Sequence, residues 1–137
     1  MKSSYLFLFC MLAFLVVVAP PANAILQSSD CWGAGNTMQQ NECFESELKK
    51  ANQGLTITYE NLIKLVKNHG EEWVKDLRNA QNKWVEFRQG NCAFYGGYLA
   101  GGSGAVLYYM DCMVRTTKER DAELKKATAI LVERGYQ

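Results

Sequence analysis

The sequence predicts an all-α protein: a small antiparallel bundle of three helices with two disulfides and a Gly-rich loop. Apolar residues recur at intervals of three and four along three long stretches, as they do on one face of a helix. No stretch alternates apolar and polar residues between turns, as a strand would. Four cysteines follow an N-terminal export signal, and cysteines of exported proteins usually pair as disulfides. These observations favour a small exported helical domain.

The N-terminus has the pattern of a cleaved export signal. A basic start at Lys2 precedes an apolar run over residues 5–18, and two prolines then break the run. Residues 22–24, Ala-Asn-Ala, fit the small-x-small cleavage rule. The run is shorter than the about 20 residues that span a bilayer, so we expect cleavage of residues 1–24 and no membrane span in the mature chain. Residues 25–137 are then expected to form a single domain, periplasmic or secreted.

The charge of the chain argues against a nucleic-acid partner. The 15 Lys and Arg residues face 14 Asp and Glu, and no basic stripe is present. The acids are unevenly placed, because residues 25–48 contain no Lys or Arg and four acids: Asp30, Glu42, Glu45 and Glu47. This acidic end is expected either to attract a cationic partner or to favour the start of a helix through the helix dipole.

Four cysteines lie beyond the export signal, and four cysteines allow three pairings. We expect Cys31–Cys43 and Cys92–Cys112, because each pair lies across one helix end and can meet without rearranging the chain. Each bridge closes a loop of modest size, worth about 3 kcal/mol in the chain-entropy description. Zinc is a poor competitor, since no CxxC motif is present and His69 is the only histidine. We expect neither a metal nor a cofactor.

The first helix is expected to begin at Asn36 or Thr37, and Thr37 with Gln40 has the spacing of a capping box. Its apolar face comprises Ala51, Leu55, Tyr59, Leu62 and Val66. Gly54 interrupts this face at a cost of about 1 kcal/mol relative to Ala, which leaves open one long helix or two pieces. Residues 68–70, Asn-His-Gly, end the helix.

The second helix begins with Glu71 and Glu72, acids that suit a first helical turn. Its apolar face comprises Trp73, Leu77, Ala80, Trp84 and Phe87. Residues 96–104 contain five glycines and are therefore expected not to form regular helix. A third helix follows. Its apolar face comprises Val106, Tyr109, Met110, Met113, Thr117, Leu124, Ala127 and Leu131.

Residues suited to catalysis are sparse. His69 stands alone in the turn between the first two helices. Glu71 and Glu72 are adjacent, so on a helix they point in different directions and form no carboxylate pair. Ser103 lies among glycines, but neither GxSxG nor SxxK is present, and the glycines lack the GK[ST] of a phosphate loop. The sequence therefore predicts a binding protein rather than an enzyme.

A more specific motif runs through the second helix into the third. It reads LRxAQxxWxxFRxxxC over residues 77–92 and continues with Gly101, Gly102, Ser103, Cys112, Thr117, Arg120 and Leu124. Upstream it includes Met38, Cys43, Ala51, Leu55, Tyr59 and Leu62. This pattern, over about residues 31–127, resembles the N-terminal domain family of LprI-type lysozyme inhibitors. The resemblance implies a small exported helical protein with paired cysteines that binds a lysozyme.

The chain departs from the family pattern at three places. An acid usually follows the alanine matched by Ala51, where this chain has Asn52. An asparagine usually follows the leucine matched by Leu55, where it has Thr56. Residues 89–90 are Gln-Gly where Asp-Ala is common. These differences change local polar contacts without disturbing the apolar faces.

Several motif residues border the apolar face and carry polar or aromatic groups. They are Arg78, Gln81, Trp84, Arg88, Thr117 and Arg120. Arginine offers several donors in a fixed fork, so we expect these side chains to hydrogen-bond helix ends and loop backbone rather than a partner.

The Gly-rich loop is the better candidate for a partner-binding element. Tyrosine gives a large contact area at low entropic cost, and a loop closed at its neck by Cys92–Cys112 loses less entropy on docking. The predicted contact residues are Tyr95, Tyr98, Gly101, Gly102 and Ser103. One alternative is that these tyrosines cap the bundle core. Another is that the scaffold binds a protein other than lysozyme, as an immunity-type or envelope-stress module.

Overall fold

The computed structural model describes residues 30–100 and 102–136, with only the backbone described at residues 98–100 and 103. This part of the chain forms three long helices and no strand: α1 (Thr37–Lys67), α2 (Glu71–Phe94) and α3 (Ala105–Glu133). Three short helical turns complete it: η2 (Asp30–Gly33), η3 (Tyr95–Ala100) and η4 (Gly102–Gly104). The predicted all-α bundle is confirmed. The expected export signal, residues 1–24, lies outside the described residues.

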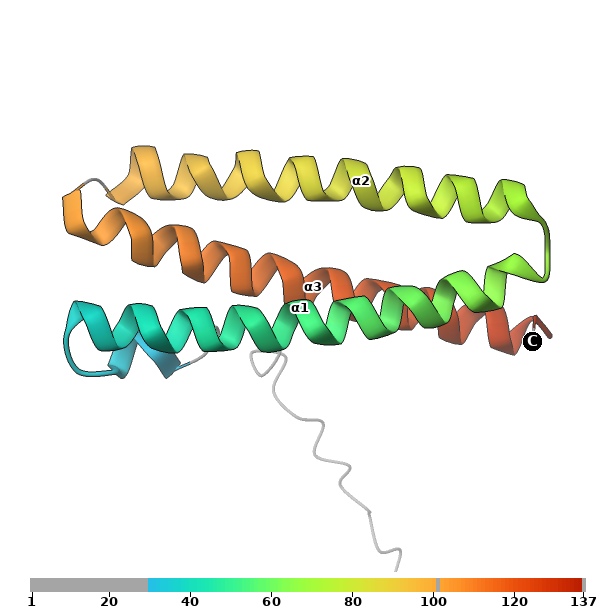
Figure 1. Ribbon diagram of the computed structural model, residues 1–137, viewed down its shortest axis with the longest axis horizontal. Helices are drawn as coiled ribbons and strands as arrows, with labels where there is room; N and C mark the ends of the chain where they lie inside the picture. The colour runs from blue at the N-terminus through green and yellow to red at the C-terminus, as the bar shows by residue number, and fades with distance from the viewer. Residues whose placement is uncertain (1–29, 101, 137) are drawn as a thin grey trace, which may run out of the picture.

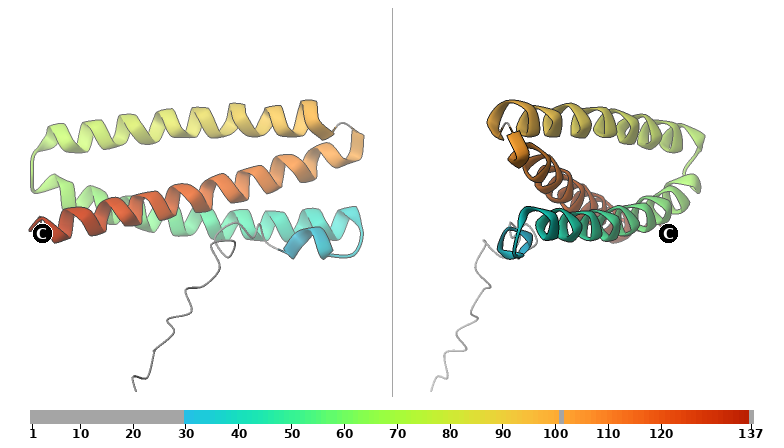
Figure 2. Two further views of the ribbon diagram at one scale, coloured as in Figure 1. Left: turned by 180° about the vertical axis from the view of Figure 1, so that it is seen from behind. Right: turned by 60° about the vertical axis from the view of Figure 1, so that its left-hand side comes forward.

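The three helices run back and forth along one long axis (Figure 1). α3 begins beside the end of α2 and crosses the molecule obliquely toward α1 (Figures 1 and 2). It packs against α1 far more extensively than α2 packs against either neighbour. The main core therefore lies between α1 and α3, while α2 stands partly apart.

Asn36, one of the two predicted cap residues, caps α1. Its Oδ1 accepts two backbone N–H bonds from the first turn, each 3.1 Å, and Gln39 Oε1 accepts the Asn36 N–H at 3.0 Å. This reciprocal pair is a capping box. The predicted Thr37–Gln40 pair was wrong, because the Gln40 amide instead donates to the Trp32 carbonyl at 2.9 Å.

α1 is one continuous helix that passes through Gly54. Four of its five predicted apolar residues are buried, and Tyr59 is half-buried. The helix ends where predicted, since Gly70 has φ 122°, a conformation that other residues rarely adopt. Because α1 is continuous at Gly54, the alternative of two shorter helices is excluded.

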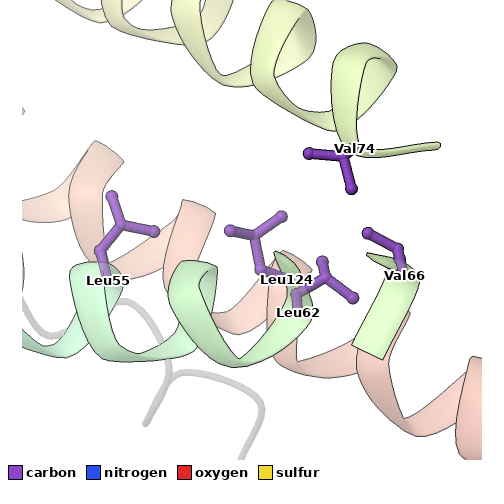
Figure 3. Packing of buried hydrophobic residues seen from close by; sticks show 5 residues of the cluster. All are labelled: Leu55, Leu62, Val66, Val74 and Leu124. Atoms are coloured by element: carbon purple, nitrogen blue, oxygen red, sulfur yellow. The ribbon is translucent and has the colours of Figure 1, made fainter. Parts of the chain in front are cut away.

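The largest apolar cluster joins all three helices (Figure 3). Val74 of α2 points toward Val66 of α1 in this view. Its buried members are Leu55, Leu62, Val66, Val74 and Leu124. Val74 is the buried residue that α2 contributes to this cluster, and Leu77 and Trp84 of α2 pack against it as half-buried side chains.

The predicted apolar face of α2 is only partly buried. Trp73 and Phe87 are 40% and 60% exposed, and Ala80 is exposed as well. Val74 and Cys92 are buried instead. The prediction assumed a helix covered across its whole apolar face, whereas α2 meets its neighbours along one narrow side. The side of α2 that is buried therefore contains Val74 and differs from the predicted apolar face.

α3 lies between the other helices and buries a wider face than predicted. Of the predicted face, Met113, Thr117 and Leu124 are buried, and the half-buried residues are Tyr109, Met110, Ala127 and Leu131. Residues buried beyond the prediction are Leu107, Cys112, Val114 and Thr116. Val106 was predicted to be buried but is 46% exposed, because it lies at the tip of the bundle, in the first turn of α3.

Both predicted disulfides are confirmed. Cys31–Cys43 ties η2 back onto α1, with 5.5 Å between the Cα atoms. Cys92–Cys112 ties the end of α2 to α3, with 5.4 Å between the Cα atoms. Both bridges lie toward the same end of the bundle, at the left of Figure 1. We call it the disulfide end.

Candidate functional site

The disulfide end also carries the Gly-rich segment, residues 95–104. We expected no regular helix there, but Tyr95–Ala100 forms a turn of π-helix and Gly102–Gly104 a turn of 3₁₀-helix. Gly96 explains part of this order. A Cβ at Gly96 would lie 2.9 Å from the Ala105 carbonyl oxygen and 2.9 Å from the Tyr109 Cβ. The absent side chain lets the segment pack tightly on α3, so glycine here permits close contact.

The structure describes two of the five predicted contact residues in full. Tyr95 is half-buried beside the Cys92–Cys112 bridge, with its ring edge-on to Phe94 at 6.1 Å. Gly102 is exposed and has φ +55°, which favours glycine. The side chains of Tyr98 and Ser103, and all of Gly101, lie outside the described residues.

A network centred on Arg88 joins the three helices. Arg88 Nη1 donates to Thr117 Oγ1 of α3 at 2.7 Å and to Asn52 Oδ1 of α1 at 3.1 Å. Its guanidinium also lies over the Trp84 ring, 4.7 Å from the centroid. Thr117 is fully buried and donates to the Met113 carbonyl at 2.6 Å. The network fixes how α2 sits on the other two helices.

Burial lowers the pKa of Arg88. The Arg88 Nε is buried and has no acceptor among the described residues. Its two hydrogen-bond acceptors in the network, an amide and a hydroxyl, are neutral. Arg88 thus serves as a structural cation.

Arg120 also lies beside the Trp84 ring. Its Nε donates to Gln81 Oε1 at 3.1 Å, its Nη1 pairs with Glu123 at 2.8 Å, and its guanidinium lies 5.9 Å from the Trp84 centroid. The expectation of hydrogen bonding is met, although the acceptors are side chains rather than helix ends and loop backbone. Arg78 differs, because it is exposed in a shallow hollow beside Tyr59.

An aromatic pair at the disulfide end was not predicted from the sequence. The rings of Trp32 and Tyr108 lie 5.0 Å apart, and Trp32 also lies edge-on to Phe44 at 5.4 Å. Trp32 is 38% exposed and Tyr108 46% exposed. The feature of the sequence that could have indicated it is the position of Trp32 directly after Cys31, because the Cys31–Cys43 bridge holds the backbone next to Trp32. The 75 residues between Trp32 and Tyr108 in the chain gave no sign that the two rings would be in contact.

The described residues offer little for catalysis. They contain no group of three or more His, Cys, Asp or Glu side chains that could hold a metal ion. His69 packs on Tyr136 and Trp73 at the opposite end, with centroids 4.5 Å and 5.6 Å away. No helix in this part of the chain is both long and apolar enough to cross a bilayer.

The sequence profile of a family described as "Lysozyme inhibitor LprI" matches residues 31–124, which include both disulfides and the Arg88 network. The chain belongs to the LprI family. The resemblance inferred from the motif is thereby confirmed. LprI proteins form an inhibitor family rather than an enzyme family, and the two disulfides fit a location outside the reducing cytosol.

A second comparison finds one similar protein without an assigned role. It is an uncharacterized protein of Rhizobium meliloti (strain 1021), 28% identical over 125 residues, covering 84% of this chain and 90% of the relative. No solved structure matches the chain. The LprI assignment therefore supports a lysozyme-inhibitor role at the level of the family.

Proposed function

We propose that this LprI-family protein is exported and inhibits a lysozyme by blocking the muramidase cleft with the disulfide end of its bundle. The observation that carries the proposal is that the Gly-rich segment at this end is attached to the rest of the bundle. The Gly-rich segment connects α2 to α3, Cys92–Cys112 joins the helices on either side of it, and Gly96 packs closely on α3. A segment ordered before binding loses little entropy when it docks.

The chemistry of the target suits such a tip. A glycosidase places two carboxyl groups on either side of a cleft that must admit the sugar chain. A narrow segment rich in glycine can enter the cleft and exclude the substrate. We assign the contact to Tyr95, Tyr98, Gly101, Gly102 and Ser103, of which Tyr95 is half-buried and also packs beside the Cys92–Cys112 bridge.

Export completes the proposal. Residues 1–24 are assigned as a cleaved signal, and residues 25–137 as a single secreted or periplasmic domain. The exposed acids Asp30, Glu42 and Glu45 lie near the tip and would draw a basic enzyme toward it.

A titration of lysozyme with the purified mature protein tests the function. We expect inhibition that saturates near one inhibitor per enzyme. Tyr98→Ala should lose inhibition while its thermal unfolding stays unchanged. Tyr136→Ala is the matched control, because this tyrosine lies at the opposite end beside His69. Absence of protection against every lysozyme class would refute the proposal.

A flank of α1 supports a second candidate, an interaction module for a protein other than lysozyme. A hollow of ≈ 790 Å³ beside α1 is lined by Leu48, Ile57 and Met110 among others, and Ile57 is 61% exposed. Exposed apolar surface of this kind is typical of protein contacts. Recovery of one non-lysozyme protein by the wild type, and its loss with Ile57→Glu, would favour this candidate.

A further inference from the structure

Trp32 and Tyr108 form a small aromatic surface at the disulfide end, which we call the aromatic platform. Their rings lie 5.0 Å apart, and more than a third of each residue is exposed. Tryptophan and tyrosine are enriched among the residues that dominate binding energy at protein interfaces. The platform lies outside the Gly-rich segment to which the proposed function assigns the contact.

The protein holds the platform in place from several sides. The neighbouring Cys31 is fully buried and bonded to Cys43, and the Gln40 amide donates to the Trp32 carbonyl at 2.9 Å. Beneath the Trp32 ring lies Phe44, which is fully buried. An anchor already fixed in the free protein loses little conformational entropy on binding. Cys31–Cys43 thus holds a large apolar side chain at the surface.

Charge indicates the kind of partner. Residues 30–48 and 89–114, which build the disulfide end, contain no Lys or Arg. They contain five acids: Asp30, Glu42, Glu45, Glu47 and Asp111. Glu47 is paired with Lys118 and Lys50, whereas Asp30, Glu42 and Glu45 are exposed. An aromatic anchor with an acidic rim is complementary to a cationic surface that has an apolar recess.

The opposite end provides an internal comparison. Trp73 is 40% exposed, close to the 38% of Trp32, and it also packs on other aromatic rings. Its neighbours along the chain carry both signs, because Lys67 and Lys75 accompany Glu71 and Glu72. Exposure of a tryptophan is therefore common to both ends. At the disulfide end the segments around Trp32 and Tyr108 contain acids without Lys or Arg, although Arg115 follows directly and its guanidinium lies 5.9 Å from the centroid of the Tyr95 ring.

We infer that the aromatic platform is a second docking contact, on which a strongly basic lysozyme seats an apolar recess while the acidic rim accelerates its approach. This inference rests on the proposed function and adds a contact outside the Gly-rich segment. Trp32 then controls the lifetime of the complex, since truncating a central anchor mainly raises the dissociation rate. The rim controls association, since charges outside the buried centre mainly change that rate and its salt dependence.

The test measures association and dissociation rates of immobilised lysozyme with the mature protein. Trp32→Ala is expected to weaken binding by at least about tenfold, mainly through faster dissociation. The matched control Trp73→Ala should stay within about twofold of the wild type, because Trp73 belongs to the first turn of α2, whereas Cys92–Cys112 fastens the last turn of that helix. Combined Asp30→Asn, Glu42→Gln and Glu45→Gln should slow association and flatten its dependence on salt.

Tyr108→Ala guards against a folding defect in Trp32→Ala, because Tyr108 belongs to α3 and not to η2. At least one folded platform variant, checked by circular dichroism, must lose affinity. If the wild type inhibits lysozyme and Trp32→Ala and Tyr108→Ala bind it as tightly as Trp73→Ala, the platform is not a contact. The proposed function would then remain intact. A wild type that binds no lysozyme would overturn both.

Discussion

Gly96 shows how a single absent side chain shapes the proposed binding tip. The Ala105 carbonyl oxygen and the Tyr109 Cβ each lie 2.9 Å from the position that a Cβ would take. Contacts this short require movement, and one of the two atoms belongs to the backbone of α3. The neighbouring Gly97 has no atom within 4 Å of its Cβ position. Gly96 therefore permits a close approach to α3 that a side chain would prevent, whereas a side chain at Gly97 would meet no neighbour.

Gly96→Ala is expected to destabilise the protein by about 1–3 kcal/mol, the range for inserting a methyl group into packed structure. Gly97→Ala should be neutral or stabilising by up to about 1 kcal/mol, because alanine restricts the unfolded chain without meeting a neighbour. Urea unfolding of both variants measures the difference in free energy of unfolding. Equal stabilities would mean that η3 does not pack on α3 as described.

At the same scale, the sequence predicted the polar motif residues better than it predicted their partners. Arg88 lies four residues after Trp84, so their stacking follows from helical spacing. Its hydrogen bonds to Asn52 and Thr117 span 36 and 29 residues and join separate helices. Such contacts depend on how the helices are placed, which periodicity alone does not define. Asn52 was noted in the sequence only as a departure from the family pattern, and its hydrogen bond with Arg88 was not predicted.

At the scale of elements, a regular apolar pattern located each helix but not always its buried side. In α1 the predicted face is the buried face, because this helix has α3 along its length. In α2 the same kind of pattern leaves Trp73 and Phe87 exposed. Spacing of three and four defines an apolar face, whereas the neighbours decide which part of it is covered. The sequence contains no local sign that α2 would stand apart.

One ion-pair group supports the contact between α1 and α3. Glu47 of α1 accepts from Lys118 of α3 at 2.9 Å and from Lys50 at 3.0 Å. The hydrogen bond from Lys118, followed by that from Lys50, holds the Glu47 pKa below its ordinary value of 4.5. A carboxylate whose pKa is lower in the folded protein stabilises the fold above its unfolded pKa, and this contribution is lost as the pH falls through the folded value.

Glu47→Gln is therefore expected to lower the free energy of unfolding by about 0.3–1 kcal/mol at pH 7, the range for a partly exposed pair. The difference from the wild type should shrink as the pH falls below 4.5 and disappear once Glu47 is protonated in both states. Urea unfolding between pH 7 and pH 3 measures it. Glu60→Gln, at an exposed acid of α1, corrects for the loss of one negative charge. A difference that grows toward low pH would contradict the assignment.

At the scale of the whole molecule, the two ends of the bundle are held differently. The disulfide end has two covalent links, whereas the other end has the short turn after α1 and the packing of His69, Trp73 and Tyr136. α2 has the fewest tertiary contacts of the three helices, and Cys92–Cys112 fastens its last turn to α3. This bridge should therefore control the order of both α2 and the Gly-rich segment that follows it.

Paired replacement of the cysteines separates the roles of the two bridges. By chain entropy alone, Cys31→Ala with Cys43→Ala and Cys92→Ala with Cys112→Ala should each cost about 3 kcal/mol, because the loops span similar lengths. Opening Cys92–Cys112 should in addition increase hydrogen exchange over residues 83–94, since the Arg88 network would then hold that half of α2 without a covalent link. Opening Cys31–Cys43 should spare those amides and loosen η2, where Trp32 lies. Mass spectrometry of exchanged fragments distinguishes the patterns, and equal exchange over residues 83–94 in both variants would show that packing, rather than the bridge, orders the end of α2.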